Sequence, residues 1–417
     1  MDLHDQLFRR ESARLVAAVT RIFGVHNLPL AEDVVQDAFS RALEVWNERG
    51  VPENPTAWLM TTAKNRALDV VRRERTARTF APELGRLLES EWTIVPLVNE
   101  AFAAHTIRDE QLRMMFSCCH PRLSEDTQVA LILNILCGFS ANEIASAFLT
   151  GRAAIEKRVS RGKQVLAGST RLFDLADSEF ESRLSAVRQA LYLLFNEGYH
   201  GASSKSVVRT ELCAEAMRLT DLLREHPPAA TPTTNALAAL MRLHAARLPA
   251  RLDSGGDLSP LLDQDRSAWD ARLIADGLSL MEQSATGLTL TPYHVEAAIA
   301  AVHASARRVE DTDWTAIVSL YDRLMDLAPS PVVALNRAIA IAERDGAEQG
   351  LDALYAIDDR DRLASYPFYP AAVGEMQLRR GNRDAARASF QAALGLARNA
   401  TERRFLEKRL LSCEPGP

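Results

Sequence analysis

Apolar residues recur at intervals of three and four positions along nearly the whole of this 417-residue chain. That spacing places them on one face of an α-helix, whereas a half-buried β-strand needs strict alternation. Alanine, leucine, arginine and glutamate dominate, and no run of alternating β-branched residues appears. We therefore predict an all-α protein, long enough for about two or three domains that each bury a core.

Two features of the sequence exclude other classes of protein. The first residues, MDLHDQLFRRES, lack a signal-peptide pattern, and no apolar run reaches the roughly 18 residues that span a bilayer. We expect a cytoplasmic protein without membrane contact. The five cysteines are an odd number without a CxxC pair, so we expect reduced, mostly buried thiols. Cys118, Cys119 and His120 are adjacent, but such side chains point apart on a helix, and we predict no metal site.

The stretch from Asn54 to Arg78, NPTAWLMTTAKNRALDVVRRERTAR, is a predicted basic helix. Asn54 or Thr56 can cap its first turn. From Lys64 to Arg78, six basic residues stand against two acidic ones, a net charge of +4 in a chain of net charge −6. This concentration favours phosphate contact, although an ordinary solvated helix face is the alternative. Its predicted buried face is Ala57, Leu59, Met60, Ala63, Ala67, Val70 and Val71.

Two further helices are predicted before this one, at residues 3–23 and 30–46. The second has an outer face of Glu32, Asp33, Gln36, Asp37, Ser40 and Glu44. The helix dipole explains acidic residues in a first turn, but it explains Gln36 and Asp37 less well. The polar loop at residues 47–55 can hold an unstacked base. The predicted inner face of the second helix is Val34, Val35, Ala38, Phe39, Ala42, Leu43 and Trp46.

A second informative stretch runs from Gly138 to Leu166. Ser140 and Glu143 form a predicted capping box, a short turn follows at residues 149–151, and a second helix begins near Arg152. Two short helices joined by a tight turn are the helix-turn-helix arrangement that enters the major groove. Residues 152–171 carry a net charge of +5, which leaves −15 for everything outside the two basic stretches. The residues predicted to be exposed on the second helix are Arg152, Glu156, Lys157, Ser160, Arg161, Lys163 and Gln164.

The segments LAEDVVQDAF, AWLMTTAKNRALDVVRRE and FSANEIASAFL with RVSRGKQVL resemble, in this order and spacing, the bacterial sigma-70 family, in particular its extracytoplasmic-function group. The resemblance covers roughly residues 5–170. It implies a sigma region 2 domain at residues 1–80, a linker at 81–106 and a region 4 helix-turn-helix domain at 107–172. It also implies RNA polymerase core, through the β′ clamp helices and the β flap, and promoter DNA as partners.

The resemblance assigns roles to particular residues. It implies that the polymerase-binding residues are Asp33, Gln36, Asp37 and Phe39. It implies that the −10 element is read and opened by the loop at 47–55 together with Lys64, Asn65, Arg66, Arg72 and Arg73. It places Arg152, Lys157, Ser160 and Arg161 in the −35 element. Leu149 departs from the family, which often has glycine in this turn.

Trp58 and Asp69 of the first basic stretch are assigned structural roles. Trp58 is interpreted as a core residue rather than as a platform for a base. Asp69 is expected to orient a neighbouring arginine.

Almost 250 further residues follow, with predicted helices at 180–195, 207–225 and 235–246 in a helical extension spanning 178–310. The turn-rich segment NEGYHGASS separates the first two of these helices. Asp263, Asp265, Arg266 and Asp270 are interpreted as an exposed ion-pair network, with a small-molecule or interdomain contact as the alternative. His294 and His303 are nine positions apart, too rotated to share a metal.

A helix-pair repeat of about 34 residues is predicted at 311–412. Gly346 and Gly381, Leu351 and Ala386, and Tyr355 and Phe390 are each 35 apart, and Ile317 and Tyr321 precede Leu351 and Tyr355 by 34. GNRDAARASFQAALGLA resembles the second half of a tetratricopeptide repeat, and some extracytoplasmic-function sigma factors carry such a fused domain. By resemblance, the extension regulates the sigma domains or contacts polymerase.

The combined prediction is a promoter-specificity subunit of RNA polymerase with a fused C-terminal regulatory domain. The alternative is a stand-alone helix-turn-helix regulator whose helical domain senses a ligand or peptide. No glycine-rich phosphate loop, HExxH or GxSxG motif is present, so we predict neither an enzyme nor a cofactor. The acidic remainder of the chain is a candidate cover for the basic patches in the unbound protein.

Overall fold

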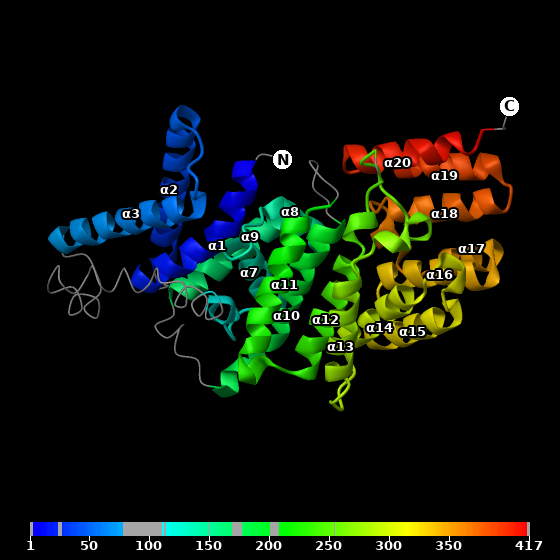
Figure 1. Ribbon diagram of the computed structural model, residues 1–417, viewed down its shortest axis with the longest axis horizontal. Coiled ribbons are helices and arrows are strands. Elements are labelled where there is room, and N and C mark those ends of the chain that lie inside the picture. The colour runs from blue at the N-terminus through cyan, green and yellow to red at the C-terminus, as the bar shows by residue number, and fades with distance from the viewer. Residues whose placement is uncertain are drawn as a thin grey trace. The chain divides into compact units, whose positions relative to one another are not determined.

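The computed structural model describes residues 3–23, 27–77, 111, 114–148, 150–168, 177–200, 208–253 and 255–414. Within these residues the chain is helical, with one isolated β-bridge between Leu252 and Leu258 and no strand (Figure 1). The all-α prediction is confirmed. The chain divides into two compact units, Met1–Leu194 and Phe195–Pro417.

The first unit begins with three helices, α1 (Leu3–Phe23), α2 (Leu28–Arg49) and α3 (Pro55–Ala77), which all pack against one another. The side chain of Asn54 caps α3 by accepting from the Ala57 N–H at 3.0 Å. Trp58 of α3 is half-buried and meets the buried Trp46 of α2 edge to face, with ring centroids 5.4 Å apart. This contact agrees with the interpretation of Trp58 as a core residue.

The inner faces of α2 and α3 differ from prediction at three positions. Ala57 is exposed rather than buried, and Leu43 is 44% exposed. Leu68, which the predicted inner face omits, is buried. The side chain of Val71 and the predicted linker at 81–106 lie outside the described residues.

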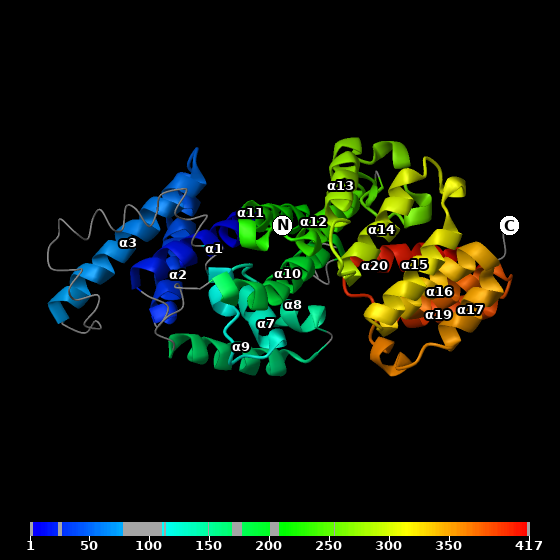
Figure 2. The same ribbon diagram turned by 90° about the horizontal axis from the view of Figure 1, so that it is seen from below.

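A second group of helices in this unit contains α7 (Glu125–Ile135), α8 (Ala141–Ala147) and α9 (Arg152–Ala167), seen together in Figure 2. The predicted capping box is confirmed: Glu143 N–H donates to Ser140 Oγ at 3.3 Å, and Ser140 N–H donates to Glu143 Oε2 at 2.8 Å. Gly162 lets α9 approach α7, because a Cβ there would lie 2.7 Å from a methyl group of Leu131. Leu149, in the turn, lies outside the described residues.

Helix α10 (Asp177–His200) is longer than predicted, since it continues through Asn196–His200 instead of ending in a turn. It leads from the first unit into the second. There follow α11 (Thr210–Glu225), α12 (Pro232–Ala245), α13 (Ala271–Ser284) and α14 (Pro292–Ser305). Helix α12 begins three residues earlier than predicted, because Thr231 caps it and Pro232 occupies its first position.

The loop before α13 contradicts the predicted ion-pair network. Asp265 and Asp270 accept hydrogen bonds from backbone N–H groups and so act as caps. Arg266 donates to the carbonyl oxygens of His303 and Ala306 and to the Thr312 hydroxyl. Asp265, Arg266 and Asp270 thus satisfy polar groups of their own unit, because aspartate caps and arginine-to-carbonyl bonds compensate polar atoms that helix ends leave open.

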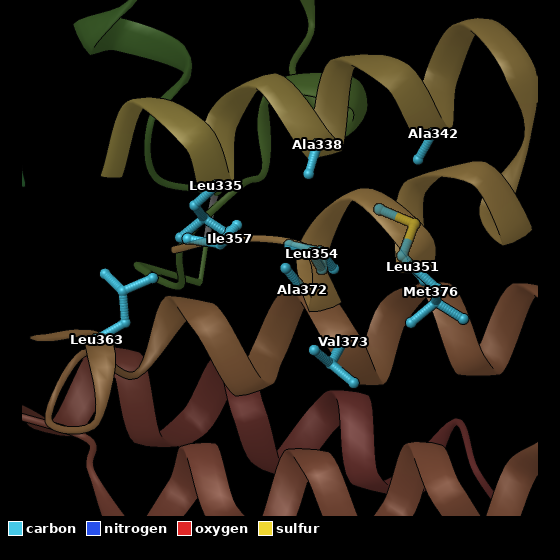
Figure 3. Packing of buried hydrophobic residues seen from close by; sticks show 10 residues of the cluster. All are labelled: Leu335, Ala338, Ala342, Leu351, Leu354, Ile357, Leu363, Ala372, Val373 and Met376. Carbon is cyan, nitrogen blue, oxygen red and sulfur yellow. The ribbon is translucent and has the colours of Figure 1, made fainter. Parts of the chain in front are cut away.

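The chain ends in successive helices that pack on their neighbours: α15 (Trp314–Leu327), α16 (Pro331–Asp345), α17 (Ala347–Tyr355), α18 (Phe368–Arg379), α19 (Arg383–Gly395) and α20 (Ala400–Leu411). Figure 3 shows Leu335, Ala338 and Ala342 of α16 facing Leu351 and Leu354 of α17, with Ala372, Val373 and Met376 of α18 beyond. The core of this part is thus shared between consecutive helices.

The turns of the predicted repeat agree with the sequence, but part of its register is wrong. Gly346 and Gly381 both have positive φ, at +109° and +80°, which glycine adopts without strain. Phe390 is 1% exposed, whereas its predicted equivalent Tyr355 is 46% exposed. Leu354 takes the buried position, because α17 begins directly after its glycine and α19 begins one residue later. The tetratricopeptide assignment stays a prediction.

No helix among the described residues is both long and apolar enough to cross a membrane. All five cysteines are free and buried, as expected from the sequence.

Candidate nucleic-acid interface

Helix α9 presents a polar, cationic face. Its inner side buries Ile155, Gly162 and Leu166. The four residues assigned to the −35 element, Arg152, Lys157, Ser160 and Arg161, are all exposed on the other sides of the helix. The structure therefore brings them onto one accessible surface about three turns long.

The basic residues of α9 differ in whether their charge is already paired. Arg152 binds Glu156 of the same helix, with Nε and Oε1 2.6 Å apart. Arg158 lies 3.6 Å from an Asp126 oxygen and over the Phe148 ring. Within the described part of the chain, Lys157 and Arg161 have no acidic partner. They are the cations of this helix that remain available to an external anion.

Lys163 was predicted to be exposed, and this is wrong. It is half-buried, and its Nζ lies 2.6 Å from Glu32 Oε1 of α2. Glu32 is 131 positions away in the sequence, so no local pattern contains this pair. The contact removes one cation from the α9 face and one carboxylate from the α2 face.

Helix α3 carries the residues assigned to the −10 element. Asn65 and Arg73 are exposed and Lys64 is half-buried. The side chain of Arg72 lies outside the described residues. Arg66 is engaged: its Nη2 and Nε lie 2.6 and 2.8 Å from Asp37 Oδ2.

The Arg66–Asp37 pair joins two of the predicted sites. Asp37 belongs to the set assigned to polymerase, and Arg66 to the set assigned to DNA. Asp69, expected to orient a neighbouring arginine, is not the partner of Arg66. Both members stay accessible, with Arg66 36% and Asp37 52% exposed, so the pair holds Arg66 in place without burying it.

The outer face of α2 combines polar and apolar side chains. Asp33, Gln36 and Asp37 are exposed, and Phe39 is partly exposed. Leu43, four positions after Phe39, is also exposed and belongs to the same side of the helix. Leu43 and Phe39 together add apolar area, bordered by polar side chains, that a protein partner can cover. The sequence missed Leu43 because the helical period alone assigned it to the core.

The adjacent thiols of Cys118 and Cys119, just before α7, do not form a reactive or metal-binding site. Burial raises the pKa of Cys118 to about 12, with Lys163 lowering it and Glu32 raising it less strongly. Burial also raises the pKa of Cys119. No cluster of metal-binding side chains occurs among the residues described. These thiols stay protonated at neutral pH and fill the core.

Comparison with known families gives three matches along the chain. Residues 7–77 match the family described as Sigma-70 region 2, which contains α2 and α3. Residues 113–166 match Sigma-70, region 4, which contains α7, α8 and nearly all of α9. Residues 183–285 match a family of unknown function, DUF6596.

Relatives of the chain fall into two groups. An uncharacterized protein of Rhizobium meliloti (strain 1021) is 38% identical over 406 residues, which are 96% of this chain and 94% of that protein. The RNA polymerase sigma factor CarQ of Myxococcus xanthus is 32% identical over 168 residues, which are 40% of this chain and 87% of CarQ. The extracytoplasmic-function sigma factor SigK of Mycobacterium sp. (strain KMS) is 26% identical over 166 residues, 39% of this chain and 80% of SigK.

Proposed function

This chain belongs to the sigma-70 family of RNA polymerase sigma factors, in its extracytoplasmic-function group, and from that premise we propose that it is a promoter-specificity subunit with a fused regulatory extension. It binds core RNA polymerase and directs initiation at particular promoters, while polymerase supplies the chemistry. The observation that carries this proposal is the exposed face of α9, where Lys157 and Arg161 have no acidic partner in the described part of the chain.

In this proposal α9 enters the major groove of the −35 element. Lys157 and Arg161 are exposed cations on one surface, and Ser160 between them can donate or accept a hydrogen bond at a base edge. Arg152 stands at the start of the helix, where its pairing with Glu156 is exposed and easily exchanged for a phosphate.

The −10 element is proposed to contact α3 through Lys64, Asn65, Arg66, Arg72 and Arg73. Arg66 supports this assignment because Asp37 fixes its guanidinium with two short hydrogen bonds. A positioned arginine loses less conformational freedom on binding a phosphate than a free one does.

Core polymerase is proposed to bind the outer face of α2. Asp33, Gln36 and Asp37 supply polar contacts, and Phe39 with Leu43 supplies apolar area that water otherwise covers. Asp37 then serves both surfaces, so changing it weakens polymerase binding and releases Arg66.

Run-off transcription with purified core polymerase and a promoter library tests the proposal. The protein is expected to direct initiation by itself, which a stand-alone helix-turn-helix regulator cannot do. Replacing both Lys157 and Arg161 with alanine is expected to reduce the amount of transcript. It should also make the negative slope of log affinity against log salt concentration shallower by about 2. Arg158→Gln is the matched control, because it removes a cation of α9 that already contacts Asp126.

Two results would contradict parts of this proposal, the first the assignment of α9 and the second the role as a polymerase subunit. The double variant and Arg158→Gln could lose promoter affinity equally, which would indicate a general effect of charge. The full protein could fail to associate with core polymerase, which would leave the regulator alternative.

The Lys163–Glu32 pair supports a second part of the proposal, that acidic residues cover basic ones in the unbound protein. Glu32→Gln releases Lys163 and is expected to raise the affinity of the free protein for promoter DNA severalfold at low salt. Asp33→Asn removes a neighbouring exposed carboxylate and serves as the control. Equal affinity of the two variants would show that this ion pair covers nothing.

The extension is proposed to regulate the sigma domains. Two observations support this role. Residues 195–417 form a compact unit of their own, and the relative from Rhizobium meliloti matches nearly the full length of the chain, extension included. Truncation followed by transcription with core polymerase tests the proposal. Unchanged promoter output and unchanged affinity for core polymerase would remove the regulatory role.

The structure decides where the truncation belongs. Arg183 of α10 donates to the Phe116 carbonyl oxygen at 3.1 Å, and Ser185 donates to Glu125 at 3.0 Å. A fragment that ends near residue 175 therefore loses contacts to the helix-turn-helix group as well as the extension. A fragment of residues 1–194 retains the first unit, and comparing the two fragments separates regulation from loss of stability.

A further inference from the structure

An arginine in the second unit is buried without a counter-charge among the residues that the structure describes. Arg247 follows α12 and is 7% exposed. Its guanidinium carbon lies 5.9 Å from the ring centre of Tyr199 and 5.5 Å from that of Trp269. Among the described residues its side chain has neither a carboxylate within ion-pair distance nor a hydrogen-bond acceptor. Burial lowers its pKa, which shows that the surroundings disfavour the charged form.

Such a group is unusual in a folded protein. Buried charges are normally paired, because desolvation is costly and the attraction to aromatic rings offsets only part of it. Hydrophobic packing alone is better served by a neutral side chain. An unpaired buried guanidinium therefore indicates that an anion from outside the described residues completes the site.

The polar atoms around Arg247 show the same deficit. Tyr199 Oη, Trp269 Nε1 and His303 Nδ1 are buried and have no hydrogen-bond partner in the part of the chain that the structure describes. The three residues are 2%, 6% and 6% exposed. Two of these residues have ring centres within 6 Å of the Arg247 guanidinium carbon, and the charge of Arg247 acts on the third. Buried polar atoms nearly always have a partner, so this group of residues favours a bound ligand.

A second arginine faces the same aromatic ring. The guanidinium carbon of Arg251 lies 4.6 Å from the Tyr199 ring centre, and one of its nitrogens donates to the Tyr199 carbonyl oxygen. Its Nε is buried without a partner among the described residues. The third arginine, Arg266, lies against Trp269 but is already used by two carbonyl oxygens and a hydroxyl.

Within the described ranges, the nearby acidic residues do not neutralise Arg247 or Arg251. Glu310 and Asp311 act on Arg266, and Glu296 acts on Tyr321. Residues 201–207, which follow Tyr199 and His200 in the sequence, contain a lysine and no acid. Burial, with the charges of Arg247 and Arg266, lowers the pKa of His303 to about 3, so this imidazole is neutral and adds no cation of its own.

We propose that Arg247 and Arg251, with Tyr199, Trp269 and His303, form a binding site for a small molecule that carries a carboxylate or phosphate group. An oxyanion accepts from both guanidinium groups and from the Trp269 and Tyr199 donors, which satisfies the charge and the orphaned atoms together. Four of the five residues lie in the segment that matches a family of unknown function. Binding is measured on the protein alone and does not depend on the proposed regulatory role.

The test uses the full-length protein and defined anions. Thermal unfolding is followed in sodium phosphate, pyrophosphate, succinate and citrate, each against sodium chloride of equal ionic strength, and binding is confirmed by calorimetric titration. The phosphate and carboxylate probes distinguish the two chemistries. At about 100 times the Kd, the midpoint of the second unit's transition is expected to rise by about 5 °C or more.

Two arginine variants make the test specific. Arg247→Gln is expected to abolish the shift and to weaken binding at least about tenfold. Arg242→Gln is the control, because that guanidinium already contacts both Asp221 oxygens, at 2.7 and 2.8 Å, and it is expected to retain the shift. In chloride alone, Arg247→Gln is expected to unfold at the same temperature as the parent or higher.

Three outcomes would overturn the proposal. In the first, none of the anions raises the midpoint of thermal unfolding above its value in chloride of equal ionic strength. In the second, Arg247→Gln retains the full increase of the midpoint that the anion causes in the parent protein. Arg247→Gln could instead lower the midpoint in chloride as far as Arg242→Gln does, which would show that the Arg247 charge is already compensated within the protein.

Discussion

A single methyl group at Gly350 tests how closely the terminal helices pack. Gly350 of α17 lies directly against α16. An added Cβ would overlap the Ala342 Cβ, and it would lie 3.1 Å from the Ala342 Cα and 3.4 Å from the Ala338 carbonyl oxygen. These are backbone or first side-chain atoms, which cannot rotate away. The two helices therefore have to separate by roughly 1 Å to restore ordinary carbon contact distances.

Two opposing terms set the expected effect of Gly350→Ala. Alanine stabilises a helix interior by about 1 kcal/mol relative to glycine. Overpacking of a tight interface costs about 1–3 kcal/mol, and the rigid neighbours of Gly350 place it at the upper end. The net expectation is a loss of about 1–2 kcal/mol. For a unit of this size the midpoint falls by about 2–4 °C per kcal/mol, or about 4 °C in all.

Thermal and urea unfolding of the purified variant measure this change. Gly395→Ala is the control, because an added Cβ there meets no atom within 4 Å and its φ is not positive. The control is expected to leave the midpoint unchanged or to raise it slightly. If Gly350→Ala is as stable as Gly395→Ala, the close approach of α16 and α17 is refuted.

Three further predictions concern single side chains. The Arg66–Asp37 pair is exposed, so a double-mutant cycle with Asp37→Asn and Arg66→Ala should give a coupling below about 1 kcal/mol in urea unfolding, and a value above about 2 kcal/mol would contradict this. Folding lowers the pKa of His303 from 6.5 to about 3, so the unfolded chain binds the extra proton between these values and stability falls as pH drops below 6.5. His303 accounts for a loss of about 2 kcal/mol at pH 5, and His303→Gln should reduce the pH dependence of unfolding by that share. The pKa values of His244 and His200 are also lowered by burial, so part of the dependence remains in the variant. With a pKa of about 12, Cys118 should resist iodoacetamide at pH 8 in the native protein and react after denaturation; rapid native labelling would show an accessible thiolate.

Local interactions explain why much of the site was predictable. The Ser140–Glu143 capping box and the Asn54 cap join residues three positions apart, so sequence spacing alone contains them. The exposed face of α9 follows from the helical period, which separates Ile155 and Leu166 from Lys157 and Arg161. The motifs of regions 2 and 4 likewise lie within continuous segments.

Distant partners explain what the sequence missed. Lys163 and Arg66 look like free cations in a helical pattern, yet each meets a carboxylate from α2, 131 and 29 positions away. Leu43 is apolar at a core spacing, yet the residues that the structure describes leave it 44% exposed. Leu354, rather than Tyr355, faces the repeat core because a one-residue difference in the turn rotates α17 by about 100°.

The sequence by itself therefore determined the helices, their caps, the two cationic stretches and the family, because these depend on residues near one another in the chain. Tertiary structure alone decided which charges remain available and where polar groups lack partners. Arg247, Tyr199 and Trp269 belong to different elements, and only folding places one guanidinium between two rings with no carboxylate beside it in the described part of the chain. Pairing and burial depend on distance in space, which helical periodicity does not encode.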